Sequence, residues 1–288
     1  MKYITFCVIL LLSFTSIAED IPLTRTSDGH LVIPASINGV SANFILDTGA
    51  TGTVVHHNML DIFNAEISGE AFNGLGLGDE ATAKIETIPI RVNSIAIGEF
   101  TSTVNTIYSQ NQTVPFPDGI SGIIGKDVLQ DLSTILDVST PRLILKSNTA
   151  SEYDSLDYLT IVQSDMGFGY VEVTLGSHDV RLIVDSGASQ TILDTQSVAD
   201  LNLTLTDHPT AKTLVSENVE LPMKQIEGVQ LIVGSQHITD DFLTTDLSGL
   251  IHSINREGHS PFIGVLGIKE LISMGALIDL KHGRLLFR

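Results

Sequence analysis

Two stretches of this chain repeat one another, Phe44-Ile-Leu-Asp-Thr-Gly-Ala-Thr-Gly-Thr-Val-Val55 and Leu182-Ile-Val-Asp-Ser-Gly-Ala-Ser-Gln-Thr-Ile-Leu193. In each stretch an apolar run ends at an aspartate, which is followed by a hydroxyl residue, a glycine and an alanine. Asp47 and Asp185 therefore occupy equivalent positions in two halves of the chain. Such a duplication predicts two similar units around a pseudo-twofold axis.

A second pair of blocks supports the duplication. Gly122-Ile-Ile-Gly-Lys-Asp-Val-Leu129 aligns with Gly264-Val-Leu-Gly-Ile-Lys-Glu-Leu271, and the alignment continues without a gap to Leu145 and Phe287. A single Asp-Thr/Ser-Gly triplet is weak evidence for any function. Two copies in matching apolar frames, each followed by a matching downstream block, indicate a duplicated site.

These blocks resemble the signature of the retroviral-type (retropepsin-like) aspartyl proteases, which is an apolar run, Asp-Thr/Ser-Gly-Ala and a later apolar-apolar-Gly segment. The resemblance covers most of residues 30–145 and 168–288. It implies an all-β fold of two retropepsin-like (acid protease) β-barrel lobes, each with a short helix. We expect a signal peptide over 1–18, an N-terminal lobe over 19–150 and a C-terminal lobe over 151–288.

By this resemblance, Asp47 and Asp185 are the catalytic residues of an aspartic endopeptidase. Hydrolysis of a peptide bond without a metal or a covalent nucleophile requires a base to activate water and an acid to protonate the carbonyl oxygen. Two carboxyl groups about 3 Å apart cannot both ionise cheaply, so the pair holds one shared proton and supplies both roles. We expect no cofactor and no metal.

The residues next to the aspartates have expected supporting roles. Gly49 and Gly187 allow a close backbone approach and donate amide hydrogens toward the carboxylates. The resemblance implies that the hydroxyls of Thr48 and Ser186 bond across the two lobes. The alanines that follow, at positions 50 and 188, offer no hydroxyl to the ionised form. The pair should therefore keep its proton to a higher pH, which predicts a mildly acidic to near-neutral optimum.

A flap is expected to close over the substrate. In the first half, Asn73-Gly-Leu-Gly-Leu-Gly78 is a glycine-rich candidate for its tip, with Gly74, Leu75 and Gly76 at its centre. The second half contains no glycine from Thr210 to Gln225. The sequence therefore predicts one asymmetric flap rather than two equal ones.

Period-two patterns and frequent Gly, Asn and Asp turns make the chain mostly β. Strands are predicted over residues 31–33, 44–46, 84–92, 135–137, 142–145, 170–175, 181–184, 229–233, 277–279 and 284–287. Short helices are expected only after Gly125 and Gly267, over 126–132 and 268–274. The polar segment 146–157 is the predicted linker.

The first 18 residues have the features of a secretory signal peptide, namely Lys2, a short apolar run and Ser16-Ile-Ala18. We expect an exported protein, periplasmic or secreted, with an uncleaved signal anchor as the alternative. The only cysteine, Cys7, lies in this segment, so the rest of the chain forms no disulfide. Without residues 1–18 the net charge moves from −19 to −20, which disfavours nucleic acid and anionic membranes as partners.

Other motifs give weaker hypotheses. His56-His57 lacks a third metal ligand at a recognisable spacing. The Gly74-x-Gly-x-Gly78 pattern has no βαβ unit around it and is not a dinucleotide fingerprint. Ser186, Ser189 and His178 are not part of a Gly-x-Ser-x-Gly elbow.

The sequence thus predicts a monomer with an intramolecular pseudo-dimer that cuts a peptide or protein substrate. Two alternatives stay open. The first is a catalytically inactive peptide-binding module with a duplicated protease fold. The second is an assembly in which each half pairs with another chain. Retention of both Asp47 and Asp185 favours the enzyme.

Overall fold

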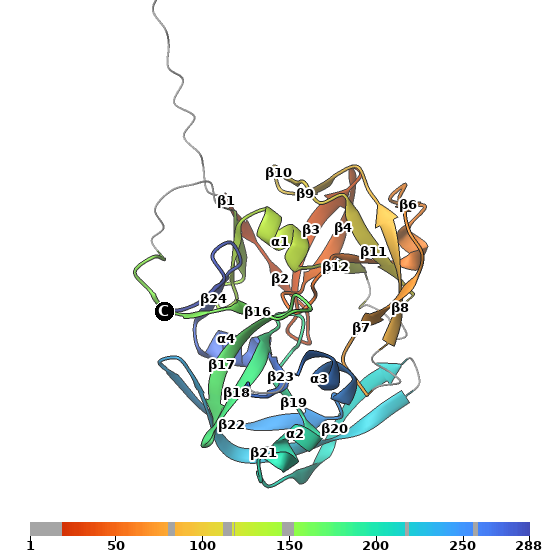
Figure 1. The fold of residues 1–288 in the computed structure, drawn as a ribbon. Helices are drawn as coiled ribbons and strands as arrows, with labels where there is room; N and C mark the ends of the chain where they lie inside the picture. The colour runs from red at the N-terminus through yellow and green to blue at the C-terminus, as the bar shows by residue number, and fades with distance from the viewer. Residues whose placement is uncertain are drawn as a thin grey trace, which may run out of the picture.

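The computed structural model describes residues 19–79, 84–111, 117, 119–145, 153–216, 219–255 and 259–288, with no side-chain description for residues 19 and 212–222. The predicted signal peptide lies outside this part of the chain. The chain forms two lobes, each built on its own β-sheet, and a third sheet that joins them (Figure 1). The prediction of an all-β, two-lobed fold is confirmed.

The N lobe is an 11-stranded sheet with the central order β3-β4-β12-β5-β11-β8. Its strands are β2 (Thr24–Arg25), β3 (Leu31–Ile37), β4 (Val40–Leu46), β5 (Val54–His56), β6 (Glu66–Ile67), β7 (Phe72–Leu75), β8 (Lys84–Arg91), β9 (Ile95–Ile97), β10 (Phe100–Ser102), β11 (Thr106–Gln110) and β12 (Ile120–Ile124). Helix α1 (Lys126–Asp131) follows β12, and the 3₁₀ helix η1 (His57–Met59) follows β5.

The C lobe is an eight-stranded sheet with the order β16-β17-β18-β23-β19-β22-β21-β20. These strands are β16 (Val162–Gln163), β17 (Gly169–Leu175), β18 (His178–Val184), β19 (Ile192–Asp194), β20 (Thr206–Ser216), β21 (Val219–Val233), β22 (Gln236–Thr245) and β23 (Phe262–Leu266). An additional pairing of β17 with β21 folds the sheet over on itself. Helix α4 (Ile268–Ser273) follows β23 as α1 follows β12.

The two lobes share one strand pattern around the aspartate loops. Strand β4 runs parallel to β12, which is antiparallel to β5, and β18 runs parallel to β23, which is antiparallel to β19. A glycine permits each antiparallel contact. A Cβ atom on Gly122 would lie 2.2 Å from the carbonyl oxygen of Val54, and one on Gly264 would lie 2.2 Å from that of Ile192.

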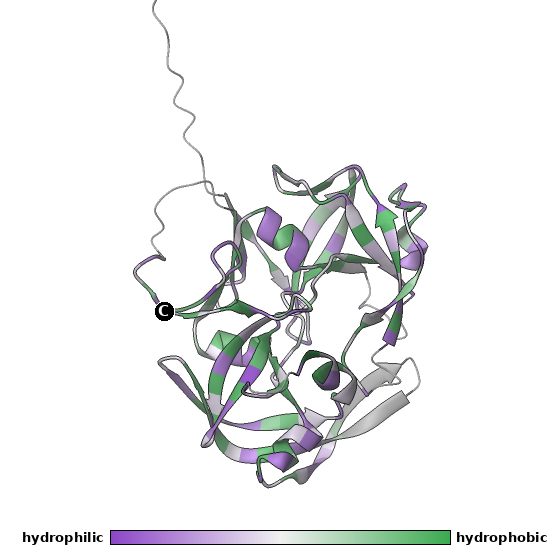
Figure 2. Ribbon diagram, in the orientation of Figure 1, coloured by the Kyte–Doolittle hydropathy of each residue, from purple (hydrophilic) through white to green (hydrophobic). Residues whose placement is uncertain are grey.

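Strand alternation places the core of each lobe. In β17, and in β3 from Ile33 onward, buried residues alternate with less buried ones, and Figure 2 shows hydrophobic and hydrophilic residues alternating along β17. The inward side chains of both lobes join one buried cluster, which includes Phe44 and Phe63 from the N lobe and Phe242 from the C lobe. This core holds β4 and β18, which end at the two aspartates.

The helix prediction is right for α1 and α4 and wrong in excluding others. The structure adds α2 (Thr195–Asp200) and α3 (Ser248–Ile254) in the C lobe, besides η1. The Asp194 carboxylate caps α2 by accepting from the amide of Ser197 at 2.8 Å. Helix α3 has no side-chain cap, and burial of Leu250, Ile251 and Ile254 stabilises it instead.

A six-stranded sheet joins the lobes, in the order β1-β14-β13-β24-β25-β15. These strands are β1 (Glu19–Pro22), β13 (Thr134–Asp137), β14 (Arg142–Leu145), β15 (Asp157–Thr160), β24 (Ala276–Asp279) and β25 (Arg284–Phe287). The two halves meet where β13 pairs with β24, with Leu136 opposite Ile278. Of the predicted linker 146–157, residues 146–152 lie outside the described part of the chain.

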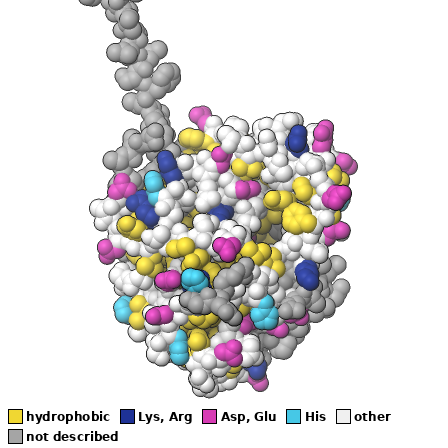
Figure 3. Space-filling model, in the orientation of Figure 1, with side chains coloured by type: hydrophobic (Ala, Val, Ile, Leu, Met, Phe, Trp, Pro, Cys, Tyr) yellow, Lys and Arg dark blue, Asp and Glu magenta, His cyan; other side chains and the backbone are white. Residues whose placement is uncertain are grey.

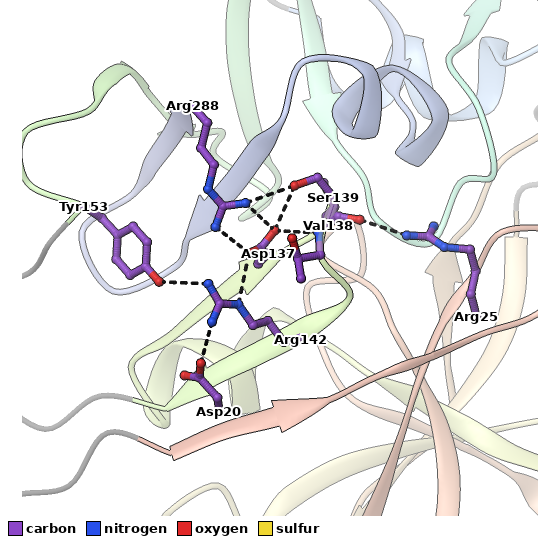
Figure 4. Close-up of polar contacts among 9 residues, drawn as sticks. Asp20, Arg25, Asp137, Val138, Ser139, Arg142, Tyr153 and Arg288 are labelled. Atoms are coloured by element: carbon purple, nitrogen blue, oxygen red, sulfur yellow. Dashed lines mark hydrogen bonds and ion pairs between the residues drawn. The ribbon is translucent and has the colours of Figure 1, made fainter.

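An ionic cluster lies where β13 ends and β14 begins in this joining sheet (Figure 4). The fully buried carboxylate of Asp137 accepts hydrogen bonds from Arg142 Nε at 3.1 Å and from Arg288 Nη2 at 2.6 Å. Arg142 also reaches Asp20 at 2.5 Å and the hydroxyl of Tyr153 at 3.4 Å. Because Arg288 comes from the C-terminal half, the cluster ties the halves together.

We predict that Asp137→Asn lowers the free energy of unfolding at pH 7 by about 2–4 kcal/mol, because it replaces the buried carboxylate that accepts from two guanidinium groups with a weaker, neutral acceptor. Urea denaturation measures this change. The control is Asp240→Asn, which removes a partly exposed carboxylate that pairs with Lys269 at 2.6 Å and should cost less than about 1 kcal/mol. Equal losses in the two variants would contradict the prediction.

The effect of Asp137→Asn should also depend on pH. Burial by itself raises the pKa of Asp137, but hydrogen bonds from Arg288, Thr140 and Arg142 outweigh it and the net pKa lies below its ordinary value of 3.8. A lowered pKa contributes stability above that ordinary value, and the contribution is lost as the pH falls through the folded-state pKa. The stability difference between wild type and variant should therefore shrink in denaturation curves recorded below pH 4.

Candidate active site

The two aspartates follow equivalent strands. Asp47 comes directly after β4, and its amide donates to the carbonyl oxygen of Ile124 at 3.1 Å. Asp185 comes directly after β18, and its amide donates to Leu266 at 3.1 Å. Each apolar-apolar-Gly segment therefore fixes the last backbone position before the loop. The two loops meet where the lobes face each other.

Four hydrogen bonds cross between the loops and link Thr48 with Ser186. The Thr48 hydroxyl donates to the carbonyl oxygen of Val184 at 2.8 Å and accepts from the Ser186 amide at 3.0 Å. The Ser186 hydroxyl donates to the carbonyl oxygen of Leu46 at 2.8 Å and accepts from the Thr48 amide at 3.0 Å. Both side chains are buried. The relative position of the two loops is thus determined by side chains from both halves.

The glycines of the two motifs bring the carboxyl groups together. A Cβ atom on Gly49 would lie 2.5 Å from Cγ of Asp185, and a Cβ atom on Gly187 would lie 2.5 Å from Cγ of Asp47. Each carboxyl group therefore rests against the backbone of the opposite loop, which only glycine permits. The structure brings Asp47, Thr48 and Gly49 together with Asp185, Ser186 and Gly187.

Backbone amides orient each carboxylate from its own loop. One oxygen of Asp47 accepts from the amides of Gly49 and Ala50 at 2.8 and 2.9 Å. One oxygen of Asp185 accepts from Gly187 and Ala188 at 2.8 and 3.1 Å. The methyl side chains of Ala50 and Ala188 add no hydroxyl donor to either carboxylate.

Burial and mutual repulsion raise the pKa of the pair. For Asp185, burial, the charge of Asp47 and a hydrogen bond with Asp47 raise the pKa well above 3.8, and the amides of Gly187 and Ala188 only partly oppose them. For Asp47, burial also raises the pKa, while the hydrogen bond donated by the Ala50 amide and the hydrogen bond with Asp185 lower it. The two carboxyls titrate together, and the pair retains a proton above the usual carboxyl range.

A second layer of polar contacts supports each loop from below. Thr53 donates through its hydroxyl to Asp127 at 2.7 Å and accepts from the Gly125 amide at 3.0 Å. In the C lobe the Thr191 amide donates to Glu270 at 2.7 Å, and its hydroxyl accepts from Gly267 at 3.1 Å. The acid in α4 thus lies one position later than the acid in α1, and its longer side chain covers the difference.

The pair opens into a cleft of about 460 Å³ between the lobes. Its walls are mainly apolar, and apolar side chains gather across the middle of the face shown in Figure 3. Of the described residues that line the cleft, only Asp47 and Asp185 are acidic or basic. The apolar lining includes Phe72, Tyr108 and Ile123 from the N lobe and Met166, Phe168 and Leu250 from the C lobe.

The predicted flap residues Gly74, Leu75 and Gly76 line this cleft at the end of β7. The flap touches the opposite lobe: the Gly249 amide of α3 donates to the carbonyl oxygen of Gly78 at 3.1 Å, and Leu75 packs on the buried cluster that contains Leu250. Of the described residues in β20 and β21, none lines the cleft. Helix α3 forms that side of the wall instead.

Sequence reasoning missed several residues of the wall, among them Phe72, Tyr108, Met166, Phe168 and Leu250. None lies in a repeated motif. The apolar spacing of Leu250, Ile251 and Ile254 is a helical signal that could have located α3. Nothing in the sequence pattern marks Met166 and Phe168, which belong to a turn between β16 and β17.

The weaker motifs have other local roles. The ring of His57 bonds to the hydroxyl of Ser109 at 2.9 Å, and His56 accepts from the amide of Asn58 at 3.3 Å. The described residues include no group of three or more His, Cys, Asp or Glu side chains able to hold a metal ion. Within the same residues, no helix has both the length and the apolarity required to span a membrane.

Comparisons with known proteins agree with this geometry. A family model described as aspartyl protease matches twice, over residues 33–128 and 171–269. The crystal structure of aspartic proteinase from Irpex lacteus has a similar fold, with a TM-score of 0.60 and 12% identity over 93% of this chain and 96% of that one. Curated protein sequences give no match. Since the two matched segments cover more than half of the sequence, this chain belongs to the aspartyl protease family.

Proposed function

We propose that the protein is an aspartic endopeptidase whose single active site is formed by Asp47 and Asp185. The close approach of the two carboxyl groups carries this proposal, because each rests against the glycine of the opposite loop. A hydrogen bond between them and their raised pKa values support one shared proton. Membership of the aspartyl protease family supports the reaction class.

In this mechanism a water molecule lies between the two carboxyl groups. The ionised carboxyl takes a proton from the water as its oxygen attacks the carbonyl carbon of the scissile bond. The protonated carboxyl gives its proton to the carbonyl oxygen, so that a neutral tetrahedral intermediate forms. Collapse of that intermediate breaks the C–N bond: one of its two hydroxyls gives its proton to the ionised carboxyl as the new C=O forms, and the protonated carboxyl gives its proton to the leaving nitrogen. The pair ends with one proton, as it began.

Burial raises the pKa of both Asp47 and Asp185. The shared proton therefore belongs to the pair rather than to either aspartate, and the ionised partner acts as the initial base. Thr48 and Ser186 act as positioning residues, because their crossed bonds fix the distance between the loops.

The cleft supports an extended peptide with apolar side chains beside the scissile bond. Apolar walls remove water and strengthen the electrostatic interactions of the pair. The hairpin around Gly74, Leu75 and Gly76 acts as the flap, and its contact with α3 supports closure over a bound chain. We propose that a single chain works alone, since both aspartates come from one chain.

We also propose that the enzyme is exported, periplasmic or secreted. This proposal depends on the sequence of residues 1–18, which are outside the described part of the chain. The lobe boundaries at residues 150 and 151 likewise stay a prediction.

The first test measures cleavage of an unstructured protein such as casein between pH 3 and 8. Either Asp47→Asn or Asp185→Asn should reduce kcat by a factor of about 10²–10⁴, because each removes one partner of the acid–base pair. A statine-type inhibitor should block the wild type. The control is Asp207→Asn, an exposed carboxyl in β20 that should leave the rate unchanged.

Loss of activity in only one of the two active-site variants would contradict a shared site. A wild type that cuts no substrate but binds peptides would instead support the inactive binding module.

The second test concerns the pH dependence. Because the pair's pKa is raised, the alkaline limb of kcat/KM should lie above the usual carboxyl range. Ala50→Ser adds a hydroxyl that can donate to the Asp47 carboxylate, so it favours the ionised form and lowers the pKa. The alkaline limb should then move down by up to about one pH unit.

Ala50→Gly is the matched control, since it changes the same side chain without adding a donor. A shift of equal size in both variants would show that the hydroxyl is not the cause.

A further inference from the structure

A buried lysine connects the lobes beside the cleft. Lys126 is the first residue of α1 and is 6% exposed. Its Nζ donates to Oε1 of Gln163 and to the carbonyl oxygen of Gly167, which both belong to the C lobe. Among the described residues, no carboxylate forms a salt bridge with it. The contact is therefore a tether of an ammonium to two neutral oxygens across the lobe boundary.

The tether reaches a tight turn between β16 and β17. The Ser164 amide donates to the carbonyl oxygen of Phe168 at 2.8 Å, and the Gly167 amide donates to that of Ser164 at 2.8 Å. The Phe168 amide donates to the Ser164 hydroxyl at 3.0 Å. Gly167 has φ +83°, a conformation that favours glycine. Residues 164–168 form this turn, the wall turn.

The duplication supplies a natural comparison for this contact. The N lobe contains the same turn over residues 26–30, where Thr26 bonds to His30 at 3.0 Å through the backbone and at 3.1 Å through its hydroxyl. In the alignment of the halves, the equivalent of Lys126 is Ile268, which is buried. A Cβ atom on Gly29 would lie 3.8 Å from Ile268. The turn of the N lobe thus packs on a methyl group of Ile268, whereas the turn of the C lobe is held by the ammonium of Lys126.

The wall turn contributes directly to the cleft. Met166 and Phe168 both line it, and Phe168 packs against the buried cluster that includes Leu250. On its other side the turn approaches the Asp47 loop, because a Cβ atom on Gly167 would lie 3.6 Å from Thr51. Without its tether the turn would lose its polar anchor on the N lobe, so its internal hydrogen bonds should open more often.

We propose that Lys126 is a positioning residue that holds the wall turn against the N lobe and thereby determines which substrate side chain fits against Met166 and Phe168. The chemistry of these two side chains selects a large apolar residue at one position of the substrate, on one side of the scissile bond. The inference rests on the proposed function and deepens it. It also gives a physical source for asymmetry in a cleft built from two equivalent halves.

The test uses Lys126→Met, which keeps the length of the side chain and removes its donors. The matched control is Lys269→Met, the same change in α4 at an exposed lysine that pairs with Asp240. Peptides that differ only in Ala, Leu or Phe at one position near the scissile bond are assayed for kcat and KM. In Lys126→Met we expect KM to rise about tenfold for Leu and Phe at one position only, with kcat within about twofold.

Gln163→Met removes the acceptor of the same contact. Because Gln163 is exposed, this variant should fold even if Lys126→Met does not. It should shift KM at the same position, and the double variant should add little, because both residues act through one contact. An equal fall of kcat for all peptides would overturn the proposal, since it would indicate damage to the carboxyl pair. Unchanged preferences would also overturn it.

A readout independent of activity is hydrogen exchange at the amides of Gly167 and Phe168. Exchange should become about tenfold faster in Lys126→Met and stay unchanged in Lys269→Met, because only the first variant frees the wall turn. Unchanged exchange would overturn the tether. If the wild type cuts no peptide, the proposed function fails while the exchange rates still decide whether the tether exists.

Discussion

Two carboxyl groups from opposite halves of the chain lie in contact, and the rest of the structure depends on this constraint. Burial and the like charge of the neighbour both oppose ionisation, so the state in which both carboxyls are ionised is unfavourable. The crossed hydrogen bonds of Thr48 and Ser186 hold the loops in place from both sides. Glycine at positions 49 and 187 leaves room for the opposite carboxyl. The joining sheet and its buried Asp137 then keep the lobes from separating.

The two halves diverge around this symmetric centre. The N lobe supplies the hairpin over the cleft, while the C lobe supplies α3 and the wall turn. Two hydrogen bonds cross the lobe boundary on these walls. Gly249 of the C lobe donates to Gly78 of the N lobe, and Lys126 of the N lobe donates to Gly167 of the C lobe. A symmetric site surrounded by unequal walls can carry out one reaction while it distinguishes the two ends of a substrate. Divergence after duplication has therefore changed the walls and kept the pair.

Much of the fold and the centre of the site could be predicted from sequence because they are local and repeated. The apolar runs before Asp47 and Asp185 predict strands, and the glycines predict close approach. Helices α2 and α3 were missed although the Asp194 cap and the apolar spacing of Leu250, Ile251 and Ile254 are recognisable signals. Alignment of the two halves places Lys269, not Glu270, opposite Asp127. The role of Glu270 is therefore visible only in the structure, where its longer side chain reaches Thr191 from one position later. The Lys126 contact joins residues far apart in sequence, and no local pattern encodes it.

The central claim is that Asp47 and Asp185 share one proton within a single chain. Titration of ¹³C-labelled aspartate carboxyls by NMR tests it most directly, with Asp47→Asn and Asp185→Asn to assign the two signals. We expect both signals to respond at each of two titration steps, and the partner left in either variant to titrate in a single step. Two independent single-step titrations in the wild type would contradict the shared proton.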